Sequence, residues 1–225
     1  AGMLIADHPT DLLDLSAAFS SLPLPRGNRV ALMTLGGGWG VVATDLCIEN
    51  GLAVPSLSKD IIARIDEILP PYWSRENPVD LVSEFNRTLP LKVAEALVKW
   101  DACDAVIHLG VVGKNYSARN SIKAAKAVNP LFKSDLGEKV LRRVEEIELE
   151  ILDHTVRLME AYGKPIIGVM LLEDETSRII TEFPGSAYKG IVFPTPERAV
   201  RALARMVEYQ NWRTCDAEGI PPTRL

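Results

Sequence analysis

The residues in this chain best suited to chemistry form a glycine run behind a short apolar segment. Residues 30–35 have the composition of a strand that a parallel sheet buries on both faces. Helical spacing begins at Val41 and ends at Asn50-Gly51, a common C-terminal stop. The residues between them allow a sharp turn: Gly36, Gly37, Gly38, Trp39 and Gly40.

Backbone N–H groups at the start of such a helix suit an anion such as phosphate. They have no partner within the helix, and they lie at the positive end of its dipole. The spacing leaves a second interpretation open, a tight strand–helix turn that binds nothing. Residues 38–43 also fit a dinucleotide-binding pattern, but no clear second strand presents an acid to a ribose. The run lacks the Lys-Ser/Thr pair of a P-loop.

A second candidate segment is Asn77-Pro78-Val79-Asp80. Proline keeps the residue before it out of the helical conformation, so this segment is predicted to be an extended loop beside a strand. Asp80 is a candidate to cap the glycine turn or to orient a ligand, and Asn77 is a candidate supporting residue. The alternative for Asn77 is an Asx-type turn that satisfies its own backbone.

The elements that must position these residues alternate along the chain. Strands are predicted at residues 30–35, 104–110, 164–172 and 190–193. Helices are predicted at residues 11–21, 41–49, 59–69, 91–100, 135–162, 176–183 and 196–209. This alternation predicts an α/β fold with a doubly wound, mainly parallel, flavodoxin-like sheet of about four to six strands. We expect one domain over residues 1–212 and a tail or interdomain linker over residues 213–225.

A helical insertion is predicted at about residues 113–160. Residues 113–134 carry five lysines and arginines without one acid, and they are interpreted as a basic loop. The following helix would span about 42 Å, more than one layer of a compact domain needs. We expect its first half to project as a dimer or interdomain arm, with Val140, Val144 and Ile147 in the contact. The alternative is a solvated insertion.

Composition narrows the class of protein. Hydrophobic residues make up 47% of the chain, and the net charge of −5 argues against a nucleic-acid or membrane-surface binder. Three cysteines far apart in the sequence suit reduced thiols in a cytoplasmic protein. The histidines at 8, 108 and 154 are too scattered for a metal site, and His108 is predicted to be a packed core residue.

Several motifs occur together in a fixed order. They are Asn28-Arg29-Val30-Ala31-Leu32, the glycine turn, Ala43-Thr44-Asp45, Glu49-Asn50-Gly51-Leu52, Asn77-Pro78-Val79-Asp80, Gly163-Lys164-Pro165-Ile166 and residues 193–203. In these motifs the chain resembles the CoA-ligase domain of the NDP-forming acyl-CoA synthetases, relatives of succinyl-CoA synthetase.

The resemblance implies a reaction for a larger enzyme, in which acyl-CoA, phosphate and NDP give acid, CoA and NTP through a phosphohistidine. The partners it implies are histidine-bearing CoA-binding domains and an ATP-grasp domain, in the same or a separate chain. CoA, Mg²⁺ and ADP or ATP would bind elsewhere in that enzyme. This chain would supply the helix N-terminus at residues 36–40 and no catalytic side chain, so by itself it should be inactive.

One residue departs from the family pattern, which commonly has proline where Trp39 stands. Two alternatives therefore stay open. One is a non-catalytic regulatory or assembly member, and the other is a free-standing flavodoxin-like nucleotide-binding module. A homo-oligomer formed through residues 113–160 is also compatible with the sequence.

Overall fold

A six-stranded sheet organises the chain in the computed structural model, which describes residues 2–82, 86, 88–129, 134–170 and 179–217. The strands are β1 (Val30–Thr34), β2 (Val79–Asp80), β3 (Ala105–Leu109), β4 (Ile166–Val169), β5 (Ile180–Thr181) and β6 (Gly190–Phe193). The helices are α1 (Pro9–Ser21), α2 (Gly37–Glu49), α3 (Lys59–Asp66), α4 (Thr88–Lys99), α5 (Asn115–Val128), α6 (Ser134–Tyr162) and α7 (Pro196–Ala217).

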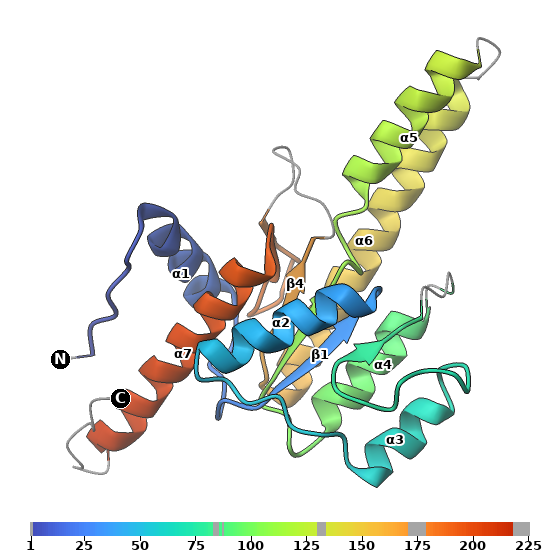
Figure 1. Cartoon of the computed structure of the whole chain (residues 1–225). Coiled ribbons are helices and arrows are strands. Elements are labelled where there is room, and N and C mark those ends of the chain that lie inside the picture. The colour runs from blue at the N-terminus through green and yellow to red at the C-terminus, as the bar shows by residue number, and fades with distance from the viewer. Residues whose placement is uncertain (1, 83–85, 87, 130–133, 171–178, 218–225) are drawn as a thin grey trace.

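The strand order is β2-β1-β3-β4-β6-β5, and every pairing is parallel except that of β5 with β6. Helices α1, α2 and α7 cover one face of the sheet, and α4 and α6 cover the other (Figure 1). The predicted doubly wound, mainly parallel α/β fold is confirmed.

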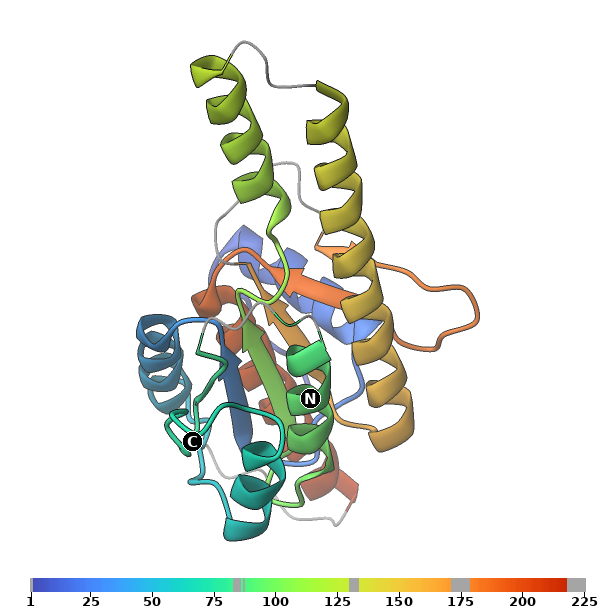
Figure 2. The same ribbon diagram turned by 90° about the vertical axis from the view of Figure 1, so that its right-hand side faces the viewer.

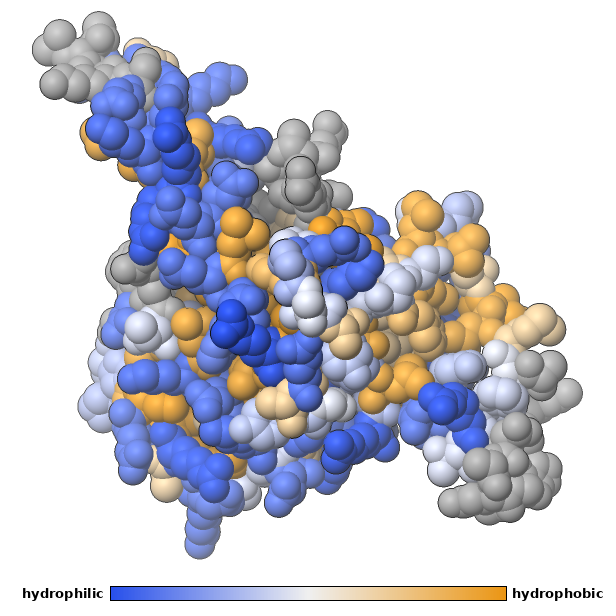
Figure 3. Space-filling view, turned by 180° about the vertical axis from the view of Figure 1, so that it is seen from behind, coloured by the Kyte–Doolittle hydropathy of each residue, from blue (hydrophilic) through white to orange (hydrophobic). Residues whose placement is uncertain are grey.

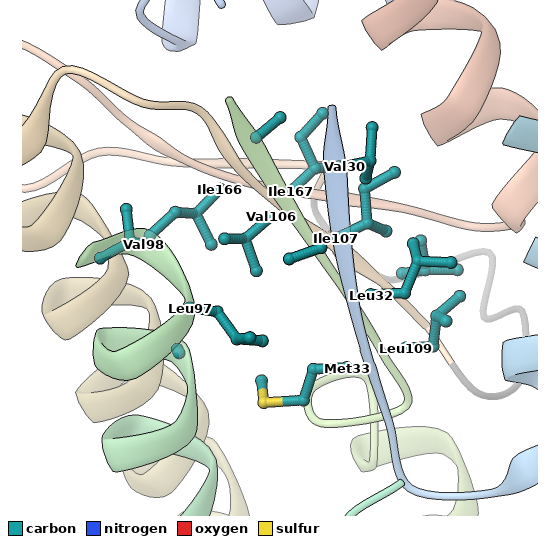
Figure 4. Close-up of a cluster of buried hydrophobic side chains, with 14 of the residues drawn as sticks. Val30, Leu32, Met33, Leu97, Val98, Val106, Ile107, Leu109, Ile166 and Ile167 are labelled. Carbon is teal, nitrogen blue, oxygen red and sulfur yellow. The ribbon is translucent and has the colours of Figure 1, made fainter. Parts of the chain in front are cut away.

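The core lies on both faces of the three central strands, β1, β3 and β4, which are buried along their whole length. Figure 4 shows Met33, Val106 and Ile166 on the side where Leu97 of α4 packs. The next residue along a strand, such as Ile107, faces the opposite helix layer (Figure 4). Continuous apolar strands follow from burial on both faces.

Three sequence predictions are corrected. The described part of the predicted helix at 176–183 contains β5, because its residues pair with β6 as an edge strand; residues 176–178 lie outside the described residues. The predicted basic loop contains α5. Residues 213–217 of the predicted tail continue α7, since the helical pattern does not stop at Asn211; residues 218–225 lie outside the described residues.

Helix α6 has two halves with different surroundings. Its second half packs on the sheet and buries Ile151, Val156 and Met159. Its first half runs antiparallel to α5, and together they project well beyond the sheet (Figures 1 and 2). We call α5 and residues 134–150 of α6 the arm. The predicted projection is confirmed, and seen from behind the arm carries mainly hydrophilic side chains (Figure 3).

Candidate functional site at the carboxyl edge of the sheet

The glycine turn lies where the order of the strands reverses. After β1 the chain adds β2 on one side, and it then crosses to place β3 on the other side of β1. In open parallel sheets, ligands bind outside the carboxyl ends of the strands at such a point. The N–H of Leu35, which follows β1, donates to the carbonyl of Leu109 at the end of β3, at 3.2 Å. The glycine turn therefore stands beside the carboxyl ends of both strands.

Helix α2 begins within the glycine run, four residues earlier than predicted. Gly36 is its N-cap residue, so one glycine forms the turn and the others form the first turn of the helix. The N–H of Trp39 donates to the carbonyl of Gly36 at 3.1 Å, and the N–H of Gly40 is 3.5 Å from the same oxygen. Within the described part of the chain, the N–H groups of Gly37 and Gly38 have no hydrogen-bond partner. Both glycines are exposed.

Trp39 does not seal the turn. Its side chain is partly buried and packs against the hydrophobic core, while Gly37 and Gly38 stay open to solvent. The two open N–H groups and the helix dipole leave a positive potential at the start of α2. Backbone groups that already point at one place bind an anion without rearrangement.

The turn is fixed by Thr34, which the sequence analysis did not single out. Its hydroxyl donates to the carbonyl of Gly36 at 2.8 Å and accepts from the N–H of Gly36 at 3.1 Å. A threonine two residues before a glycine, as in Thr34-Leu35-Gly36, has the composition of a side chain–backbone turn, and this was the available signal.

The Pro78-to-Asp80 segment packs against the first turn of α2. A Cβ on Gly40 would lie 3.1 Å from Cβ of Pro78, closer than an ordinary van der Waals contact, so glycine at this position allows the two segments to approach without displacing Pro78. Oδ2 of Asp80 would lie 3.2 Å from a Cβ on Gly37, and its Oδ1 accepts from the N–H of Val82 at 2.8 Å. The structure thus brings Asp80 beside the candidate anion site.

The side chain of Asn77 bonds the backbone of neighbouring segments, one of them the strand that leads into the glycine turn. Its Oδ1 accepts from the N–H of Leu32 at 2.9 Å, and its Nδ2 donates to the carbonyls of Val30 and Pro55, each at 3.0 Å. An Asx-type turn is therefore wrong, since the side chain bonds a strand 45 residues away in sequence. Asn77 fixes β1 and contributes to the site only through that strand.

A second helix starts at the same edge of the sheet, but its N-terminus is occupied. The Glu148 carboxylate of α6 accepts from the N–H of Lys114, the N-cap residue of α5, and from Nδ2 of Asn115 at 2.9 Å. Burial raises the pKa of Glu148, although hydrogen bonds from the backbone N–H groups of Lys114 and Gly113 oppose the shift. Burial also lowers the pKa of Lys114. Glu148 fills the anion position at α5 and anchors the base of the arm.

Other polar groups lie away from this site or inside the core. His108 is buried, its burial lowers its pKa to about 4, and it packs against Gly168 of the next strand. The predicted core histidine is confirmed.

A hollow lined by Ser58, Asp60 and Lys99, among others, lies at the amino edge of the sheet. The described residues hold no group of histidines, cysteines and acids that could bind a metal ion. Among these residues, no helix has the length and apolar character that spanning a membrane requires.

The chain matches known proteins over most of its length. Residues 30–132 match the Ligase-CoA domain. The chain is 34% identical over 216 residues to the ADP-forming 4-hydroxybutyrate–CoA ligase of Nitrosopumilus maritimus, covering 94% of this chain and 26% of that protein. It is 33% identical over 135 residues to the alpha subunit of the ADP-forming acetate–CoA ligase II of Pyrococcus furiosus, covering 57% of this chain and 29% of the subunit. The chain thus spans about a quarter to a third of the length of these relatives.

Solved structures show the same fold. The dinucleotide-forming acetyl-coenzyme A synthetase 1 of Candidatus Korarchaeum cryptofilum, in complex with phosphate and ADP, aligns with a TM-score of 0.61 and 22% identity. The alignment covers 99% of this chain and 41% of that protein. From the family match and the two sequence relatives, the chain belongs to the CoA-ligase domains of the NDP-forming acyl-CoA synthetases, as its motifs predicted.

Proposed function

We propose that this chain is the domain of an NDP-forming acyl-CoA synthetase that presents the N-terminus of α2 to a phosphoryl group. In the whole enzyme, acyl-CoA, phosphate and NDP would give acid, CoA and NTP. The phosphoryl group would be carried by a histidine on another domain, and CoA, Mg²⁺ and nucleotide would also bind on other domains. The observation that carries the proposal is the pair of open, exposed N–H groups at Gly37 and Gly38.

The chemistry assigned to this chain is electrostatic. N–H donors and a helix dipole aimed at a phosphoryl dianion stabilise its charge without moving a proton. Because these groups are fixed by Thr34 and by the packing of Pro78 on Gly40, they need little reorganisation when the phosphoryl group arrives. The Asp80 carboxylate beside Gly37 opposes a bound anion, so it would weaken the affinity for free phosphate.

Two substitutions at Gly37 distinguish the effect of losing the N–H donor from the effect of adding a side-chain atom. Gly37→Pro and Gly37→Ala both add a Cβ beside Asp80, but only proline removes the N–H. Proline is accepted at the first helical position, and Gly36 before it is already extended, at φ −154° and ψ 128°. Inorganic phosphate is titrated into each protein while the amide resonances of residues 36–40 are followed by NMR.

We expect Gly37→Pro to weaken phosphate binding about tenfold and Gly37→Ala to weaken it much less. Asp80→Asn should strengthen binding, because it removes the opposing charge and keeps an acceptor for the N–H of Val82. Equal losses in the proline and alanine variants would contradict the role given to the N–H group. A wild-type chain whose glycine resonances do not respond to phosphate would favour a regulatory or assembly member of the family.

A further inference from the structure

An acidic side chain stands beside the candidate anion site. Asp80 ends β2, and its partner in the register between β2 and β1 is Thr34, the residue that fixes the glycine turn. Oδ2 of Asp80 lies 3.2 Å from the position of a Cβ on Gly37. Because a Cβ lies about 2.5 Å from the nitrogen of its own residue, this oxygen is within about 6 Å of the open N–H of Gly37. An oxyanion that accepts from this N–H therefore lies next to Asp80.

The carboxylate of Asp80 is held in place by the backbone around it. Its Oδ1 accepts from the N–H of Val82 at 2.8 Å, and the N–H of Leu81 donates to the carbonyl of Thr34 at 2.8 Å. Val82 has a φ of 49°, in the left-handed region that a β-branched residue rarely adopts. Within the part of the chain that the structure describes, no lysine or arginine forms an ion pair with Asp80. Oδ2 is therefore an acceptor with a fixed position and no cation to offset its charge.

A carboxylate at this place affects different anions differently. Its oxygens only accept hydrogen bonds, so an oxyanion without a hydrogen brings lone pairs against lone pairs. An oxyanion that carries a hydrogen can donate it to Oδ2 in a charge-assisted bond, while its other oxygens accept from Gly37 and Gly38. A repulsive group excludes the wrong ligand in the same way that an attractive group retains the right one.

We propose that Asp80 is a specificity-determining residue, which selects phosphoryl groups that present an O–H or N–H to its Oδ2 and rejects oxyanions without a hydrogen. This inference rests on the anion site of the proposed function and names the class of ligand that the site accepts. Inorganic phosphate keeps at least one hydrogen at neutral pH and qualifies through its O–H. A phosphoryl group on a protonated nitrogen qualifies through its N–H. Sulfate has the same shape as phosphate but no hydrogen at neutral pH, and it is rejected.

Phosphate and sulfate therefore provide the test. Each is titrated into the 225-residue chain at neutral pH, and the amide resonances of residues 36–40 give the dissociation constant by NMR. We expect the wild type to bind phosphate at least about tenfold more tightly than sulfate, because a site that hydrogen-bonds a ligand O–H discriminates against an analogue without it. Asp80→Asn removes the charge and keeps an acceptor for the N–H of Val82. Its affinity for sulfate should rise about tenfold more than its affinity for phosphate.

Asp45→Asn is the matched control. It removes the same charge from α2, at an exposed residue eight positions after Gly37 and about 12 Å along the helix. The affinities for the two anions should change by the same factor, within about twofold, because a distant charge acts on both alike. Phosphoramidate, whose donor is an N–H, distinguishes the source of the ligand. Binding tighter than that of phosphate indicates a phosphoryl group carried on nitrogen, and binding between those of phosphate and sulfate indicates free phosphate.

Two kinds of failure are distinguishable. A wild type that binds sulfate as tightly as phosphate has the anion site without the selection, and this result overturns the role of Asp80 alone. An Asp80→Asn variant that raises both affinities by the same factor does so as well. If neither anion moves the glycine resonances in any variant, the anion site itself is absent and the proposed function fails with it. Circular dichroism verifies the fold of each variant, and the comparison of the two anions on the wild type does not depend on any variant.

Discussion

Replacing Asn77 with alanine removes three hydrogen bonds to the backbone beside the candidate site. The side chain accepts from the N–H of Leu32 and donates to the carbonyls of Val30 and Pro55, at 2.9 to 3.0 Å. β2 pairs with β1 only from Met33 onward, so Asn77 takes the place of a neighbouring strand over the first half of β1. Alanine would remove these partners from the N–H of Leu32 and the carbonyl of Val30, both in a buried strand, and from the carbonyl of Pro55.

Each lost hydrogen bond of this kind costs about 1 kcal/mol, so Asn77→Ala should lower the free energy of unfolding by about 3 kcal/mol. Urea unfolding followed by circular dichroism measures the change as a lower midpoint at unchanged slope. Asn28→Ala is the matched control: it removes one exposed hydrogen bond, to the carbonyl of Gly51 at 3.0 Å, and should cost less than about 1 kcal/mol.

The same variant separates support of the fold from contact with a ligand. While Asn77→Ala remains folded, its phosphate affinity should stay within about twofold of the wild type, because the side chain bonds β1 and not the open N–H groups of α2. A loss of stability no larger than that of Asn28→Ala would refute the assignment of Asn77 to the strand. So would a loss of phosphate binding at unchanged stability.

Two further predictions concern residues near the sheet. Gly40→Ala should destabilise the fold by about 1 to 3 kcal/mol, since its Cβ would crowd Pro78. At Gly38, no atom lies within 4 Å of an added Cβ, so Gly38→Ala should be neutral or stabilising. Thermal unfolding compares the stability of the two variants. Burial lowers the pKa of His108 to about 4 from its ordinary 6.5. The stability that its neutral ring contributes is therefore complete above pH 6.5 and is lost as the pH falls toward 4. Between pH 7.5 and pH 5 the wild type should lose about 2 kcal/mol more than His108→Met, and equal losses by urea unfolding would contradict this.

Local patterns determined much of the fold. Runs such as residues 104–110 are apolar and too short for a helix, and their alternation with helical spacing was enough to predict a doubly wound parallel sheet. Among the residues that the structure describes, six of the seven helices contain or overlap a helix that periodicity predicted. The exception, α5, buries no residue, and an exposed helix shows weaker apolar periodicity than one that packs on a core. The edge strand β5 was missed because two residues give no alternation to detect.

The candidate site depended on tertiary structure to a greater degree. The glycine run indicated an anion site, but the sequence did not show that α2 starts at Gly37, since glycines have low helix propensity and the packing of Pro78 on Gly40 supports this helix start. Asn77 bonds a strand 45 residues earlier in the chain, a partner that only the folded sheet brings within reach. In the same way, the sequence predicted a projecting helix, but only its pairing with α5 decided which of its apolar residues face solvent. Spacing along a chain determines local conformation, whereas contacts between distant segments depend on how the layers close around the core.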